Sequence, residues 1–160
     1  MSIQPTETAA NLKHPALLRI CGRGEIPVAI SPADIHAMET VEITDHPLIC
    51  GSGEPRGSIS HCRGVLLTDI IGKADVIAPE HNDTKKMYVI AASDDGYKTV
   101  FSWPELFNSP VGEGIMVLIE KDGVALYEAF GGVDLLSTRD ILSGPRYVRR
   151  LSTVEIAIVT

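Results

Sequence analysis

Cys50 begins the stretch of the chain whose residue types are best suited to binding or catalysis. It is followed by small residues and an arginine, in the segment Gly51-Ser52-Gly53-Glu54-Pro55-Arg56-Gly57. Glycine lets backbone N–H groups approach a ligand closely, and arginine adds a planar, permanent positive charge. A thiol in this setting suits a soft or anionic ligand. The segment therefore predicts a cofactor site that includes Cys50, Gly51, Ser52 and Arg56; a buried cysteine beside an ordinary flexible loop is the alternative.

A second group of residues with binding potential lies near the C-terminus. Four of the eight arginines fall between Arg139 and Arg150, although the chain of 160 residues has a formal net charge of −7. An acidic chain is a poor binder of nucleic acid or anionic membranes, whose electrostatic attraction requires a basic surface. The cluster therefore predicts one small anionic ligand and neither nucleic acid nor membrane as a partner. A solvated basic edge on the last strand is the alternative.

The cysteine count and the N-terminal segment bear on the cellular compartment. Three cysteines are an odd number without paired spacing, and residues 1–11 lack the basic start and apolar core of a secretory signal. No apolar stretch approaches the roughly 18 residues that span a bilayer. We expect reduced thiols and a cytoplasmic location.

Two other kinds of site involve the histidines near Cys50. His46, His61 and Cys62 could join Cys50 in a zinc site, but the chain lacks the Cys-x-x-Cys and His-x-x-x-His spacings of structural zinc. Cys50 could also act as a hydrolytic nucleophile with His46 or His61, although no third, orienting group is evident. Both stay open as minor alternatives.

The elements that must position these residues are mostly short strands. Residues 1–14 show no periodicity and predict a flexible arm, whereas residues 15–160 predict a single domain. Helices are expected from Ser31, from Ser102 and over 65–71, and strands over 17–20, 26–30, 41–44, 87–92, 99–101, 115–121, 124–129 and 146–159. This pattern predicts a β-rich α+β fold with mixed or antiparallel sheets and short flanking helices.

Six blocks of the sequence, taken in order, resemble the molybdopterin-binding domain of the sulfite oxidase family. They are residues 21–34 (Cys-Gly-Arg-Gly-Glu-Ile-Pro-Val to Ser-Pro-Ala-Asp), Cys50 with its glycine loop, 62–67 (Cys-Arg-Gly-Val-Leu-Leu), 93–97 (Ser-Asp-Asp-Gly-Tyr) with 101–102, the 123–126 hairpin, and the Gly- and Arg-bearing segment 131–149. Each block is weak alone. Their shared order, over residues 17–159, carries the resemblance.

The resemblance implies a fold, a cofactor and a set of site residues. It implies a sulfite oxidase-type fold that binds molybdopterin, with Cys50 as the protein thiolate on molybdenum, a suitable soft ligand. The pterin phosphate would be held by Arg139, Ser143, Gly144 and Arg146, with Arg149 or Arg150 as further candidates. Arg63 and Asp95 lie in matched blocks and join Gly51, Ser52 and Arg56 as cofactor-binding residues. Tyr97 would hydrogen-bond an oxyanion substrate, unless 94–97 is only a turn.

The activity implied is that of an oxidoreductase acting on a small oxyanion or sulfoxide, served by a redox partner protein. The match also departs from the family pattern. No Gly-Asn element follows Cys50, Cys62 replaces an aromatic residue, and Val133-Asp134-Leu135 replaces a Pro-Leu-Arg core. Larger members of the family also carry extra N-terminal elements that contribute to the pocket and, in some, a C-terminal dimerisation domain, which this sequence does not show. The site is therefore expected to be shallower, or completed by a partner. A non-catalytic pterin- or anion-binding module that works with a partner protein is therefore the alternative, and a structural domain without cofactor is a third.

Overall fold

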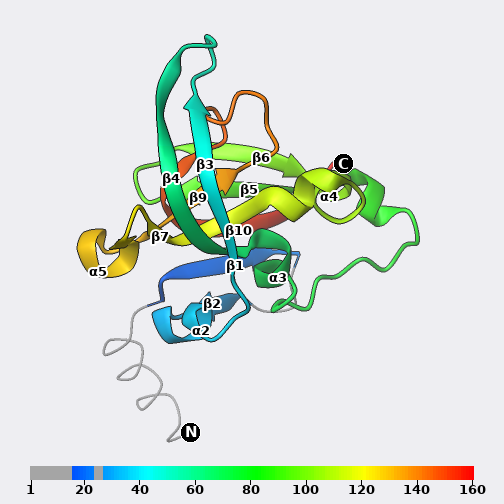
Figure 1. Cartoon of the computed structure of the whole chain (residues 1–160). Helices are drawn as coiled ribbons and strands as arrows, with labels where there is room; N and C mark the ends of the chain where they lie inside the picture. The colour runs from blue at the N-terminus through cyan, green and yellow to red at the C-terminus, as the bar shows by residue number, and fades with distance from the viewer. Residues whose placement is uncertain (1–15, 24–26) are drawn as a thin grey trace, which may run out of the picture.

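The computed structural model describes residues 16–23 and 27–160, so the arm predicted at residues 1–14 lies outside the described residues. Strands dominate the described part, and each helix is a single short turn or two (Figure 1). The strands are β1 (Leu18–Gly22), β2 (Val28–Ile30), β3 (Val41–Ile49), β4 (Pro55–Leu66), β5 (Met87–Ser93), β6 (Lys98–Ser102), β7 (Ile115–Lys121), β8 (Val124–Ala125), β9 (Val133–Ser137) and β10 (Val148–Ile158). The helices are α2 (Pro32–His36), α3 (Leu67–Ile71), α4 (Trp103–Phe107) and α5 (Leu126–Phe130), with 3₁₀ turns η1 (Asp83–Lys86) and η2 (Pro110–Gly114).

All ten of these strands belong to one mixed sheet. Its main path runs β2-β1-β10-β9-β7-β4-β3, with β5 and β6 branching from β10 and β8 pairing with β7. β1 and β10 are parallel, and the other pairings are antiparallel. The β-rich, mixed-sheet architecture with short helices is therefore confirmed. No helix in the described part of the chain is long and apolar enough to cross a bilayer.

The sheet separates two hydrophobic cores. In β7, Ile115, Val117 and Ile119 face the larger core, whereas Met116 and Leu118 face the smaller one. A strand covered on both faces reads as a continuous apolar run, and this is the pattern of residues 115–119. The smaller core also packs against Leu48 and Tyr147, two residues that reach the candidate site.

Local sequence signals fix where two helices begin. Ser31 and Ser102 are the N-caps of α2 and α4, as the sequence predicts. The expected capping box with Glu105 forms at Ser102, and Ser31 forms one with Asp34 as well. Two expectations were wrong. Residues 65 and 66 end strand β4, so the helix expected over 65–71 begins only at Leu67. The second arm of the expected hairpin, 124–129, pairs for two residues and then turns into α5.

The long β3–β4 hairpin rises from the sheet beside the β9–β10 loop, defined here as residues 138–147 (Figure 1). The two segments are joined by direct bonds. The buried Ser143 hydroxyl donates to the Pro47 carbonyl at 3.1 Å and accepts from the Ile49 N–H at 3.3 Å, and the Gly144 N–H donates to the Ile49 carbonyl at 2.8 Å. This joint holds the end of β3, and with it Cys50, against the β9–β10 loop.

Gly64 provides a test of how closely the hairpin packs on β7. A Cβ at this position would lie 2.4 Å from the Val117 carbonyl oxygen, in backbone that cannot move aside cheaply. Gly64→Ala is therefore expected to lower the free energy of unfolding by about 1–3 kcal/mol, measured by urea denaturation. Gly51→Ala is the control, because its Cβ would meet only Pro145 at 3.5 Å. Equal stability of the two variants would contradict the packing described.

Candidate functional site

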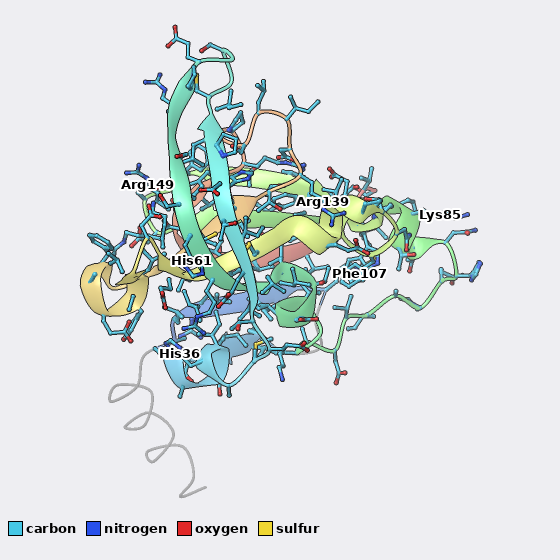
Figure 2. All side chains as sticks on the ribbon, in the orientation of Figure 1. His36, His61, Lys85, Phe107, Arg139 and Arg149 are labelled. Carbon is cyan, nitrogen blue, oxygen red and sulfur yellow. The ribbon has the colours of Figure 1, made fainter. Side chains whose placement is uncertain are left out.

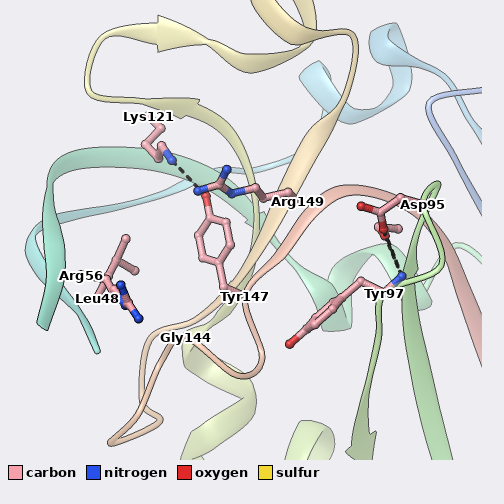
Figure 3. Close-up of a pocket in the computed structure, with 9 residues that line it drawn as sticks. Leu48, Arg56, Asp95, Tyr97, Lys121, Gly144, Tyr147 and Arg149 are labelled. Carbon is pink, nitrogen blue, oxygen red and sulfur yellow. Dashed lines mark hydrogen bonds between the residues drawn. The ribbon is translucent and has the colours of Figure 1, made fainter. Parts of the chain in front are cut away.

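A pocket of about 380 Å³ lies where the β3–β4 hairpin, the β5–β6 turn and the β9–β10 loop meet (Figure 3). Segments far apart in the sequence contribute to its wall, and most supply one or two side chains. The lining residues are Leu48, Arg56, Ser93, Asp95, Tyr97, Lys121, Gly144, Tyr147 and Arg149. A hollow of this size is in the range of small-molecule sites.

The charges on the pocket wall are mainly positive. Arg56, Lys121 and Arg149 supply three cations, against one carboxylate from Asp95. Hydrogen bonds from the Ser93 hydroxyl and the Tyr97 N–H lower the pKa of Asp95, so this carboxylate is ionised at neutral pH. The pocket is thus a local positive site on an acidic chain, suited to an anion.

A bulge in β10 brings Arg149 to the pocket. The pairing register of β10 shifts between Val148 and Leu151 against β9, and Arg150 has a left-handed φ of 54°. Val148 and Leu151 are buried on either side, while both arginines between them are exposed. A bulge breaks the strict alternation of a strand and redirects side chains, which is why such irregularities occur near functional sites.

Tyr147 forms one side of the pocket together with Lys121. The Lys121 ammonium donates to the Tyr147 hydroxyl at 3.2 Å, and that hydroxyl donates to the Asp134 carboxylate. Burial, reinforced by Asp134, raises the pKa of Tyr147, so its hydroxyl stays protonated. Asp134 also accepts the Arg150 N–H at 3.1 Å. Asp134 therefore points into this network, where each of its carboxylate oxygens accepts one hydrogen bond.

The Cys50 thiol is the most acidic of the three thiols. A hydrogen bond with the Ser52 hydroxyl, at 2.8 Å, is the main reason that the pKa of Cys50 falls to about 7. Backbone N–H groups of the loop and the Arg56 side chain lower it further. Burial raises the pKa of Cys21 and Cys62 instead. Cys50 is therefore the thiol that is substantially ionised at neutral pH, and the ionised form is the metal ligand and nucleophile.

Two residues of the pocket wall place Cys50 at its border. Arg56 lines the pocket, and its side chain helps to lower the pKa of the Cys50 thiol. Gly144 also lines the pocket, and a Cβ on it would come within 3.1 Å of the Cys50 Cα. Cys50 is half-buried, with solvent access to the loop that it opens.

Four of the eleven predicted site residues line the pocket: Arg56, Asp95, Tyr97 and Gly144. Cys50 lies beside Gly144, and Gly51 and Ser52 follow it in the hairpin loop. Tyr97 reaches the pocket, but its hydroxyl donates to the Pro145 carbonyl and so ties the β5–β6 turn to the β9–β10 loop.

Four other predicted site residues make internal contacts instead. Arg63 pairs with Glu120 at 3.3 Å, and Ser143 is the buried joint described above. Arg139 bonds Glu113 and the Pro110 carbonyl, and it lies apart from Arg149 (Figure 2). Arg146 bonds both oxygens of Asp140, and it also bonds Glu105 and the Val100 carbonyl, while its guanidinium lies over the Phe101 ring.

Sequence reasoning missed Lys121 and Tyr147 and gave Arg149 only as a further candidate. Lys121 precedes the Asp122-Gly123 turn, where a lysine reads as an ordinary hairpin residue. The bulge that exposes Arg149 depends on a positive φ at a non-glycine residue, which no local motif announces. The Arg-rich cluster was the available signal, and the structure selects Arg149 from it.

The histidines near Cys50 do not gather around it. His61 lies 3.7 Å from Glu42 on the exposed side of the hairpin, and Cys62 is fully buried in the smaller core. Burial lowers the pKa of His46, and its Nε2 has no hydrogen-bond partner among the described residues. Within residues 16–23 and 27–160, no three His, Cys, Asp or Glu side chains lie close enough to hold a metal ion by themselves.

Comparison with known proteins gives a likeness of fold. No protein-family model and no curated protein sequence matches this chain. A solved structure does match: the sulfane dehydrogenase SoxCD from Paracoccus pantotrophus, with a TM-score of 0.66 and 16% sequence identity. The match covers 90% of this chain and 38% of that one, so this chain corresponds to well under half of the other. At this identity the likeness establishes a shared fold.

The acidity of Cys50 can be measured directly. Because the thiolate is the reactive form, we expect the rate of iodoacetamide alkylation at Cys50 to rise with pH through a midpoint near 7, followed by mass spectrometry. Ser52→Ala removes the main hydrogen bond and should move the midpoint upward, whereas Ser58→Ala on the same hairpin should not. A wild-type midpoint near that of a free thiol would contradict the geometry.

Arg146 and Arg149 should differ in their effect on stability. The Arg146 side chain is 21% exposed and bonds two carboxylates, so Arg146→Gln should cost about 2–3 kcal/mol of unfolding free energy. Arg149 is exposed, and Arg149→Gln should stay within about 0.5 kcal/mol of wild type. Thermal and urea unfolding of both variants test this. A neutral Arg146→Gln would return Arg146 to the candidates for ligand binding.

Proposed function

We propose that this pocket binds molybdopterin, with Cys50 as the protein thiolate on the metal, and that the domain serves an oxidoreductase acting on a small sulfur oxyanion or sulfoxide. The observation that carries the proposal is a thiol with a pKa near 7 at the border of a positively lined pocket. Two further points support it: the fold is shared with a sulfane dehydrogenase, and the ordered sequence blocks resemble the sulfite oxidase family.

The residues around Cys50 fit the metal end of such a cofactor. One accessible thiolate is a suitable soft donor for a metal that a cofactor would already hold by its own sulfur atoms. Ser52 and Arg56 lower the pKa of the thiol and so favour its ionised form. Gly144 packs its backbone closely against Ile49 and Cys50, and any side chain there would collide with the hairpin.

The phosphate at the anionic end of the cofactor would be held by cations other than Arg139 and Arg146, which the sequence analysis had named. Arg139 and Arg146 are engaged in ion pairs, whereas Arg149 has no carboxylate within ion-pair distance among the described residues. We assign the phosphate to Arg149 and Lys121, with Tyr147 holding the lysine in place. A guanidinium and an ammonium converging on one wall are a suitable phosphate site.

The bound cofactor would supply the two-electron, oxygen-transferring chemistry. The chain's own residues would ligate, orient and neutralise charge. Tyr97 and Asp95 form the wall opposite Lys121, where an incoming substrate would pass (Figure 3). Because the Tyr97 hydroxyl already donates to Pro145, its part is to shape the entrance unless that bond opens. A redox partner protein would take up two electrons when an oxyanion is oxidised, or supply two when a sulfoxide is reduced.

A non-catalytic module that binds a pterin or another anion for a partner protein is the second candidate. The engagement of the Tyr97 hydroxyl favours it, since no uncommitted acid or hydroxyl then faces the pocket from that turn. The lowered pKa of the Cys50 thiol favours the oxidoreductase, because a module that only binds an anion does not need an ionised thiol. Dye-linked oxidation of sulfite by the loaded protein separates the two.

The decisive experiment measures cofactor content after expression in a host that makes molybdopterin. We expect wild type to carry molybdenum by mass spectrometry and a pterin by fluorescence after release. Cys50→Ser should lose most of the metal, because its soft ligand is gone, and Arg149→Gln should lose most of the pterin. Cys21→Ser is the matched control, since Cys21 lies in β1 outside the pocket. Wild-type protein devoid of both metal and pterin would refute the proposal.

A further inference from the structure

A second hollow, of about 490 Å³, adjoins the first pocket on the side of α5. Its walls come from the β7–β8 turn, α5 and the start of β10, and it shares Lys121 and Arg149 with the first pocket. The other side is apolar, formed by Val124, Leu126 and Phe130. The hollow thus has a cationic end and a hydrocarbon end.

The apolar end is exposed to solvent. Phe130, in α5, is 62% exposed and Val124, in β8, is 40% exposed. Gly131 ends α5 with a φ of 76°, and the Arg150 guanidinium fixes the Phe130 carbonyl at 2.8 Å. The aromatic ring is therefore presented by a held backbone, and an aromatic face held open to solvent is available for stacking.

The charges of this hollow leave two cations, Arg149 and Lys121, without a carboxylate partner in the described chain. Asp122 accepts the backbone N–H groups of Ser60 and His61, and Asp134 accepts Tyr147 and the Arg150 N–H. The Arg150 guanidinium is bonded to Asp94 at 2.8 Å. Both carboxylates and Arg150 are thus satisfied within the fold. Arg149 and Lys121 are the groups left to attract a ligand.

We propose that this hollow is a separate binding site for a small aromatic anion, whose ring lies against Phe130 and Val124 and whose carboxylate, sulfonate or phosphate meets Arg149 and Lys121. The apolar side explains why an organic anion suits it better than an inorganic one. Its volume fits a small molecule. The shared cations mean that an anion held in the first pocket and one held here compete for the same two groups.

The probe for this site is 8-anilinonaphthalene-1-sulfonate, which joins an aromatic body to a sulfonate and fluoresces on burial. We expect saturable binding to the folded chain. Phe130→Ser should weaken it about fivefold and Arg149→Gln about tenfold, a loss of about 1.4 kcal/mol. Inorganic phosphate should compete. Circular dichroism and unfolding curves confirm that each variant is folded, because exposed apolar surface of an unfolded state also binds this dye.

Two control variants make the test specific. Ile141→Ser removes an aliphatic residue that is 89% exposed and outside the hollow, and Arg139→Gln removes a cation outside it; both should bind the dye as wild type does. Cys50→Ser should also leave binding unchanged, so this result is separable from cofactor loss. Absence of dye binding, or equal losses in Phe130→Ser and Ile141→Ser, would overturn the inference.

The location can be checked by amide chemical shifts on titration with the dye. Shifts are expected at Val124, Phe130 and Gly132, which surround the hollow. Shifts concentrated at Gly96 and Gly144 instead would place the dye in the first pocket and overturn the second site, while leaving the first pocket intact as an anion site.

Discussion

The candidate site depends on one joint, the docking of the β9–β10 loop against the end of the β3–β4 hairpin. Ser143 is buried and bridges Pro47 and Ile49, and Gly144 bonds Ile49 as well. A buried hydroxyl that satisfies backbone groups on another segment is costly to remove, because its partners would be left unpaired. The joint holds Cys50 close to Gly144, which lines the pocket.

The division of labour among the arginines follows from the same joint. A loop that carries a site needs support, and Arg146 supplies it by tying Asp140 in the β9–β10 loop to Glu105 in α4 while covering the Phe101 ring. An arginine with two carboxylate partners has little attraction left for a ligand. The cluster that the sequence shows as one basic group is therefore two groups with different tasks: Arg139 and Arg146 brace the fold, and Arg149 faces the pocket.

The fold could be predicted from the sequence where local chemistry decides it. The capping boxes at Ser31 and Ser102, the Asp122-Gly123 turn and the β-branched run of β10 each have a short-range cause. Strand β4 was missed because residues 55–64 carry glycines and polar side chains, and their β conformation comes from pairing with β3 and β7. Pairing of this kind is non-local, so no window of sequence contains its cause.

The site was predicted in part for a related physical reason. Cys50, Ser52 and Arg56 are close in the chain, so their interaction needs only a tight loop, and the lowered pKa of Cys50 follows from it. Lys121 ends β7, whereas Tyr147 and Arg149 lie around the start of β10, on the other side of β9, so only the tertiary structure brings the three together. Which arginine is left without a partner depends on the positions of Glu113, Asp140 and Glu105, which only the tertiary structure gives.

Tyr147 connects the packing of the smaller core to the electrostatics of both pockets. Its ring packs against that core, and its hydroxyl accepts from Lys121 while donating to Asp134. Such a chain of bonds needs a protonated hydroxyl, and the raised pKa of Tyr147 guarantees one across the physiological range. Lys121 is therefore held in one place without being neutralised by a direct ion pair with Asp134. The wall between the pockets stays rigid and positive, and this is the property that anion binding on either side requires.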